Sequence, residues 1–114
     1  MCKGSLEFLK HIQDECTFIV SVMGHGLSKE SFLKDETLKR AVVRSLEIIG
    51  EATKSIPAHE KLKWESIEWK NMAGMRDRLI HDYMGVNYHI VWDVVKNKIP
   101  SLLESINALI DTNK

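Results

Sequence analysis

The chain has 114 residues, of which 44% are hydrophobic and 28% are charged, the composition of a soluble globular protein with a buried core. Sixteen basic residues balance sixteen acidic ones, and a net charge of zero excludes a strongly basic nucleic-acid coat protein. Any contact with RNA or DNA must then come from a local patch, which a second subunit could complete. We expect residues 1–114 to form a single domain.

Uncharged stretches of the sequence are short. The longest run without Asp, Glu, Lys or Arg covers residues 16–28, which is too short to cross a bilayer. The first residues carry charges where a signal peptide would be apolar, so we expect a cytoplasmic protein. Cys2 and Cys16 form no C-x-x-C pair, which leaves little support for a disulfide or a zinc site. Cys16 falls on an apolar helical stripe and is interpreted as a buried small hydrophobe.

The first predicted helix covers residues 6–23, where apolar side chains recur at steps of three and four. These positions are Leu9, Ile12, Cys16, Ile19 and Met23. Gly24-His25-Gly26 should end the helix, because glycine readily adopts the left-handed conformation found at helix ends. A phosphate-binding loop is the less favoured interpretation, since neither the glycine spacing nor a preceding strand fits it.

Capping residues and prolines mark the following elements. Ser28 can cap a short helical turn that carries Phe32, and Asp35 can cap a second long helix that Pro57 ends. Residues 58–68 are expected to be a connection with one helical turn.

A third main helix is predicted over residues 69–83, after which Gly85 and Asn87 break the pattern. Asn87 can cap a fourth helix, which Pro100 should kink or divide. No strand-like alternation or internal repeat is visible, so the predicted fold is all-α, a bundle of four to five helices. The first helix has a wide apolar face and three tryptophans cluster near the middle of the chain, which makes a homodimer a reasonable expectation.

Most histidines give no indication of a metal site. His59-Glu60 resembles the start of a zinc-protease motif, but Lys63 occupies the place of the second histidine. The histidines outside this motif and outside residues 75–85 lack partners at the spacing of metal ligands. We therefore expect neither a metal nor a cofactor.

Residues 75–85, MRDRLIHDYMG, concentrate charged and titratable side chains. In one interpretation they form a solvated helix face, with His81 and Tyr83 covering the helix end. In another, Arg76 holds phosphate and His81 moves a proton, which in principle suffices for metal-free RNA cleavage by the RNA's own 2′-hydroxyl. On an unbroken helix Arg76 and His81 would lie roughly 140° apart. They converge only if the helix ends or unwinds between them, or if a partner chain completes the site.

This segment resembles the R-x4-H-x-Y signature of the HepT family, the helical toxins of HEPN-type toxin–antitoxin pairs. The signature is matched by Arg76, His81 and Tyr83. Further features of the family occur in the expected order over roughly residues 5–110, and they are Ala41-Val42, Ile49-Gly50-Glu51-Ala52, Trp69, Gly85-Val86, Val91-Trp92 and Pro100. Two departures are visible: residues 64–69 lack the prolines common in the family, and Asp77 follows the motif arginine where asparagine is common.

The resemblance implies a metal-independent ribonuclease toxin of a type VII-like toxin–antitoxin pair. Arg76 would stabilise phosphate, His81 would act as acid or base, and Asp77 would orient one of them. A homodimer with facing motifs would concentrate two copies of Arg76 and His81 in one RNA-binding cleft. A nucleotidyltransferase (MntA-like) antitoxin would transfer AMP from ATP to Tyr83 and so block RNA by bulk and by like-charge repulsion.

Two other functions remain open from the sequence. Arg76 and His81 could bind phosphate without turnover, in a non-catalytic nucleotide- or substrate-binding subunit of a nucleotidyltransferase complex. The bundle could also serve only as an assembly partner with a structural motif. Cleavage of RNA by the purified protein would distinguish a ribonuclease toxin from these two alternatives.

Overall fold

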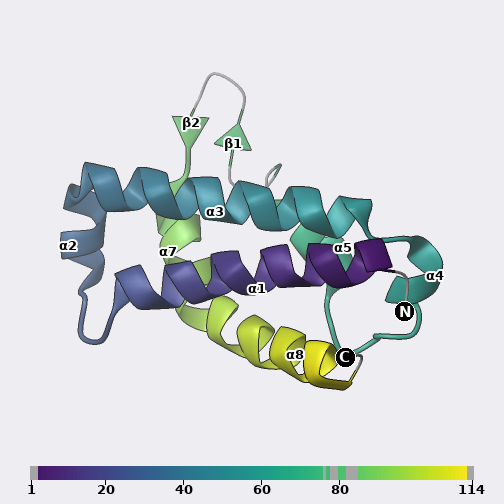
Figure 1. Cartoon of the computed structure of the whole chain (residues 1–114). Helices are drawn as coiled ribbons and strands as arrows, with labels where there is room; N and C mark the ends of the chain where they lie inside the picture. Colours follow the sequence, from purple (N-terminus) through teal and green to yellow (C-terminus); the bar gives the residue numbers. More distant parts are fainter. Residues whose placement is uncertain (1–2, 76, 78–79, 82–84, 113–114) are drawn as a thin grey trace.

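The computed structural model describes residues 3–75, 77, 80–81 and 85–112, and its fold is mainly helical (Figure 1). The helices among these residues are α1 (Lys3–Met23), α2 (Lys29–Lys34), α3 (Glu36–Ser55), α4 (Ala58–Lys61), α5 (Trp69–Ala73), α7 (Tyr88–Asn97) and α8 (Ile99–Thr112). Two short strands, β1 (Ile80–His81) and β2 (Gly85–Val86), pair with each other. The predicted all-α class is confirmed.

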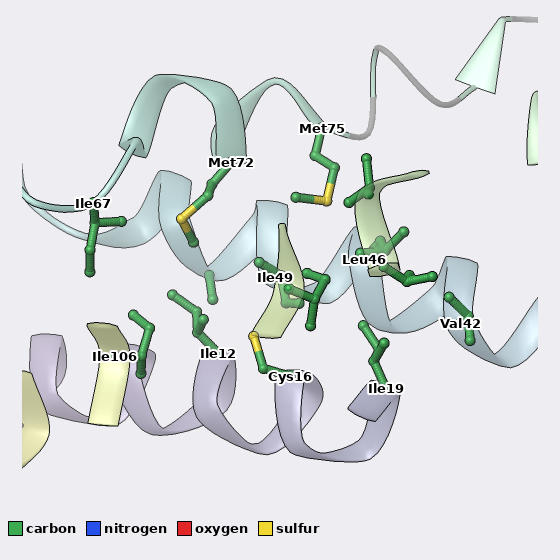
Figure 2. Packing of buried hydrophobic residues seen from close by; sticks show 14 of the residues in the cluster. Ile12, Cys16, Ile19, Val42, Leu46, Ile49, Ile67, Met72, Met75 and Ile106 are labelled. Atoms are coloured by element: carbon green, nitrogen blue, oxygen red, sulfur yellow. The ribbon is translucent and has the colours of Figure 1, made fainter. Parts of the chain in front are cut away.

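The core lies between α1 and α3, which run side by side along their length, with α8 on the other side of α1 (Figure 1). All five apolar positions predicted for the first helix are buried. Figure 2 shows Ile12, Cys16 and Ile19 of α1 turned toward the α3 side chains. The α3 partners in this view are Val42, Leu46 and Ile49. Each large side chain buried here contributes about 1.5–3 kcal/mol of hydrophobic stabilisation.

The end of α1 follows the predicted helix stop. Gly24 and Gly26 have φ angles of 57° and 81°, a conformation that side chains other than glycine rarely adopt. The loop follows a helix and not a strand, so it lacks the context of a phosphate-binding loop.

Three predicted N-caps are confirmed. Ser28 and Asp35 each accept a hydrogen bond from the backbone N–H three residues later, at 3.1 and 3.0 Å. Asn87 accepts from the N–H groups two and three residues later, at 3.1 and 3.3 Å. Such a cap typically stabilises a helix by about 1 kcal/mol, because it satisfies an N–H that has no partner within the helix.

The predicted proline breaks are also confirmed. α3 ends at Ser55, two residues before Pro57. The long C-terminal helix is divided at Lys98, where α7 ends and α8 begins, because Pro100 cannot donate a backbone hydrogen bond. The connection after Pro57 contains the expected helical turn, α4.

The predicted helix over residues 69–83 is confirmed in its first part and wrong in its second: residues 69–73, 75 and 77 are helical, but Ile80 and His81 are not. α5 ends at Ala73, with Gly74 as its C-cap, and the chain is extended again at Ile80–His81. These two residues pair antiparallel with Gly85–Val86, in the register Ile80 to Val86 and His81 to Gly85. Gly85 has a φ of 81°, which favours glycine at this position. Strands of two residues are too short to show the alternation by which strands are predicted.

α5 lies directly on α3. A Cβ atom added at Gly50 would be 3.4 Å from the carbonyl oxygen of Met72, an ordinary contact, so the two backbones leave room for no side chain larger than a methyl group. The Trp69 indole N–H donates to the Trp64 carbonyl at 3.0 Å, and the two rings lie 6.0 Å apart. These contacts fix the start of the segment that carries the motif.

Cys16 is fully buried, as predicted for a small hydrophobe. Burial, followed by the nearby charge of Glu15, raises the pKa of the Cys16 thiol to about 12. The described part of the chain contains no cluster of three or more His, Cys, Asp or Glu side chains able to hold a metal ion. None of the helices among the described residues is long and apolar enough to cross a membrane.

Candidate functional site

The motif segment is described in part. Arg76 and Tyr83 lie outside the described residues. Asp77 is helical and exposed, and His81 is described by its backbone in β1, opposite Gly85. The structure therefore locates the chain at two of the four predicted site residues.

The ribbon of β1 and β2 projects from the bundle, with Val86 half-buried against the core. In Figure 1 it extends from the bundle beyond α3, on the side opposite to α1 and α8. The His81 backbone thus belongs to a projection and not to the helical core. A projecting ribbon is accessible to a large ligand such as RNA, whereas a position within the α1–α3 layer would not be.

The chain does not run as one helix from Arg76 to His81. Met75 and Asp77 are helical, but Ile80 and His81 are already in an extended strand. The separation of roughly 140° between Arg76 and His81 applies only to an unbroken helix. That objection to a joint role for the two side chains is therefore removed.

A cluster at the end of β2 holds the ribbon against the bundle. The Lys39 ammonium group lies 4.4 Å from the centre of the Tyr88 ring, and Tyr88 begins α7 two residues after β2. Lys39 is buried and pairs with Glu36 at 2.9 Å. The hydrogen bond from Lys39, and then its charge, lower the pKa of Glu36. The Lys39–Tyr88 contact therefore ties α3 to the chain that leaves the ribbon.

A second anchor connects α2 with α7. The rings of Phe32 and Trp92 have centroids 5.5 Å apart at an angle of 45°, a tilted arrangement that aromatic pairs favour. Phe32 is fully buried, so the start of α7 is held from two sides. Neither the Lys39–Tyr88 contact nor the Phe32–Trp92 contact was predicted from the sequence, because each joins residues far apart along the chain.

A cavity of about 350 Å³ lies beside the start of the motif segment. Its walls come from residues 66–75, from α7 and from the first half of α8. Met75, the residue before Arg76, is one of its lining residues. Sequence reasoning missed this cavity, although Pro100 gave a signal for the helix division around which it forms.

Comparison with known proteins identifies the family. The family model described as "Ribonuclease HepT-like" matches residues 5–109. A protein of Thermococcus cleftensis named "Probable ribonuclease HepT" is 52% identical over 102 residues, which cover 90% of this chain and 92% of the relative. A protein of Caldanaerobacter subterraneus subsp. tengcongensis, provisionally named an RNase, is 46% identical over 107 residues, covering 94% of this chain and 95% of the relative.

A third relative, from Methanocaldococcus jannaschii and also provisionally named an RNase, is 48% identical over 86 residues, covering 75% of this chain and 71% of the relative. No solved structure matches the chain. The family match nevertheless spans nearly the whole chain and includes residues 76–83, which carry the motif. The chain belongs to the HepT-like ribonuclease family.

Proposed function

We propose that the protein is a metal-independent endoribonuclease whose active site is formed by Arg76 and His81. The observation that carries this proposal is the match to the HepT-like ribonuclease family over residues 5–109, a range that includes both residues. The exposed position of the ribbon supports it, because RNA needs an accessible site. The extended backbone at His81 supports it further, because Arg76 and His81 are not confined to different faces of one helix.

In the proposed reaction the 2′-hydroxyl oxygen of RNA forms a bond to the adjacent phosphorus, and the bond from phosphorus to the 5′-oxygen breaks. His81 accepts the 2′-hydroxyl proton or donates a proton to the leaving oxygen, a role worth about 10²–10⁴ in rate. Arg76 offsets the negative charge that develops on the phosphate oxygens. Asp77, exposed beside Arg76, would orient one of these two groups.

We propose that two chains form the working enzyme, with the two motif segments facing one cleft. Two chains of zero net charge also have no overall excess of positive charge, but two copies of Arg76 in one cleft would provide a local basic patch for RNA. Exposed apolar side chains on α1 give a further reason to expect self-association, and these are Phe18, Val20 and Val22.

We also propose that the protein is a cytoplasmic toxin silenced at Tyr83. A nucleotidyltransferase antitoxin would transfer AMP from ATP to the Tyr83 hydroxyl, with pyrophosphate as the leaving group. The added phosphate and nucleoside would exclude RNA by bulk and charge. Incubation with such an enzyme and ATP should increase the intact mass by whole AMP units, and Tyr83→Phe should abolish the increase.

The second candidate is a non-catalytic nucleotide- or substrate-binding subunit of a nucleotidyltransferase complex. The same arginine and histidine would then bind phosphate without turnover. Growth arrest on expression without a partner would favour the toxin, because a binding subunit alone has no reason to stop growth.

The deciding experiment is cleavage of total RNA in EDTA by the purified protein, expressed without a partner. His81→Ala tests the proposed acid–base group, and His89→Ala is the matched control, because His89 is exposed on α7 outside the motif. We expect cleavage by the wild type and by His89→Ala, and none by His81→Ala. Absence of cleavage by all three, with intact mass showing unmodified Tyr83, would favour the non-catalytic subunit. Cleavage by His81→Ala at the wild-type rate would contradict the mechanism.

A further inference from the structure

The cavity beside the motif segment forms where α7 passes into α8. Pro100 has no backbone N–H, and Lys98 between the two helices has a φ of −114° and a ψ of −42°. The residues on both sides of this division, from Val94 to Ser105, form one wall of the cavity. Residues 66–75 form the other wall. The cavity thus forms because Pro100 divides α7 from α8 and because α5 packs on α3.

The floor of the cavity is apolar. It is formed by buried side chains, which are Ile67, Met72, Met75, Val94 and Ile99. Figure 2 shows Ile67, Met72 and Met75 on the segment that contains α5, with Met72 and Met75 directed toward the core. Thioether groups are polarisable and make favourable contacts with aromatic rings. A flat aromatic ligand would therefore find a suitable surface here.

The rim of the cavity is polar and carries two amides. Asn71 donates an Nδ2 hydrogen bond to Glu68 at 3.0 Å, and Asn97 donates one to Asp93 at 2.7 Å. Each carboxylate accepts from one amide N–H, which leaves the amide oxygen and the second N–H for a ligand. Lys98 adds one positive charge to the same rim and Glu68 one negative charge.

The size of the cavity restricts its occupant. About 350 Å³ lies within the range of small-ligand sites. A helix from another protein, with a diameter of about 10–12 Å, would not enter it. A single planar group fits, and a group with apolar faces and a hydrogen-bonding edge matches both the floor and the rim. Nucleobases have this combination.

Contacts with the bases would add to those of a local basic patch. A chain with zero net charge has no general excess of positive charge for RNA, and contacts with the bases do not need one. Proteins that bind an extruded base hold its faces between aromatic or apolar side chains and read its polar edge, and the side chains here are of the apolar kind. Met75 lines the cavity and is the residue before Arg76, so the cavity adjoins the beginning of residues 75–85.

We propose that this cavity is a subsite for one unpaired RNA base next to the phosphate that is cleaved. The floor binds the faces of the base, and the Asn71 and Asn97 amides bind its edge. The subsite rests on the proposed ribonuclease function and makes single-stranded RNA the substrate class. Paired bases would not reach the floor, so duplex RNA should bind more weakly.

The test uses the His81→Ala protein, so that binding is measured without cleavage. The probe is a short single-stranded oligoribonucleotide of mixed sequence, titrated by calorimetry. Ser105→Trp fills the cavity from α8, and Ala108→Trp is the matched control, because Ala108 is exposed on α8 and does not line the cavity. Asn97→Leu removes a rim amide at an exposed position and keeps the test valid if Ser105→Trp fails to fold.

We expect Ser105→Trp to weaken binding of the oligoribonucleotide about tenfold or more, the usual contribution of one stacked base. Asn97→Leu should weaken it less, and Ala108→Trp should leave it unchanged. Equal binding by all variants would overturn the subsite. A change of oligomeric state in Ser105→Trp without a change in RNA binding would overturn it too, and would assign the cavity to a second copy of the chain.

The proposed function fails separately. The protein with an intact His81 could fail to cleave the oligoribonucleotide while Ser105→Trp still weakens its binding. This result would support the base subsite and contradict the ribonuclease activity. If cleavage occurs and Ser105→Trp has no effect on binding, the ribonuclease activity is supported and the base subsite is contradicted.

Discussion

The α1–α3 layer and the segment from Trp69 to Tyr88 differ in how well local sequence patterns predict their structure. In the layer, apolar periodicity, caps and helix stops all indicate the same structure, and α1 and α3 form as predicted. In the segment, apolar spacing indicates a helix, but α5 ends at Ala73 and a ribbon follows. The motif lies in the region where the local signals fail.

The two regions therefore have different roles in the molecule. A regular two-helix layer provides stability, and its side chains are buried and apolar. The segment is held at its two ends, by the seat of α5 on Gly50 and by the Lys39–Tyr88 contact. Departures from local preference are expected at functional sites, because the surrounding structure must hold them in place. Changes in the two regions should therefore have different consequences.

Leu46→Ala should have the largest effect on stability. Leu46 is fully buried between α3 and α1, so its truncation removes apolar contacts and leaves a cavity. We expect the free energy of unfolding to fall by about 2–5 kcal/mol, measured by urea denaturation. Leu62→Ala is the control, because Leu62 is 72% exposed and its loss should cost less than about 0.5 kcal/mol. Similar losses for both variants would mean that the layer is not the stabilising core.

Gly50→Leu should disturb the junction between the two regions. A leucine side chain would meet the backbone of α5 at Met72 and push it from α3. We expect a loss of about 1–3 kcal/mol, together with faster amide hydrogen exchange in α5. Gly50→Ala is the matched control: its Cβ would make an ordinary contact at 3.4 Å, so stability should be kept or slightly raised. If Gly50→Ala lowers the free energy of unfolding as much as Gly50→Leu does, the proposed contact between Gly50 and the α5 backbone is contradicted.

Much of the scaffold could be predicted, because its signals are local. The caps at Ser28, Asp35 and Asn87 need only a side-chain oxygen a few residues from free N–H groups. The stop at Gly24 and the division near Pro100 follow from the backbone preferences of single residues. Such rules need no knowledge of distant contacts, and for this reason they held.

For the candidate site, the sequence predicts residues but not geometry. The prediction of Arg76, His81 and Tyr83 as site residues rests on a family signature, which names residues but gives no backbone path. The ribbon at His81 depends on contacts between distant residues, such as Lys39 with Tyr88, which periodicity does not report. The cavity is lined by residues from separate segments, so nothing in its local sequence indicates it.

Asn87→Ala should have a moderate effect at the far end of the motif segment. The lost side-chain oxygen leaves two N–H groups at the start of α7 without their cap. We expect a loss of about 1 kcal/mol in the free energy of unfolding, measured by thermal or urea denaturation. Asn87→Asp should keep the stability, since aspartate caps as well as asparagine and favours a helix start. Equal losses for both variants would show that the hydrogen bonds are not the cause.

Cys16 gives the smallest effect, and one confined to alkaline pH. The pKa of its thiol is raised to about 12 by burial, whereas in the unfolded chain it is about 9. The stability from keeping the thiol protonated is fully present below pH 9 and is lost as the pH rises toward 12. By pH 9.5 we expect the wild type to lose less than about 1 kcal/mol relative to Cys16→Ala.

The measurement is urea denaturation of both proteins from pH 7 to 10, in a Cys2→Ser background. Iodoacetamide should leave Cys16 unmodified in the folded protein at pH 8 and modify it in urea, because the thiolate is the reactive form. Rapid modification of the folded protein would contradict the burial of this side chain.

The division of roles is tested most directly by RNA cleavage per folded molecule in EDTA, for Leu46→Ala and His81→Ala beside the wild type. We expect Leu46→Ala to keep the wild-type rate per folded molecule at a temperature where it is folded, while its stability is reduced. We expect His81→Ala to keep its stability and to lose cleavage. Cleavage by His81→Ala at the wild-type rate per folded molecule would contradict the placement of the chemistry in the motif segment.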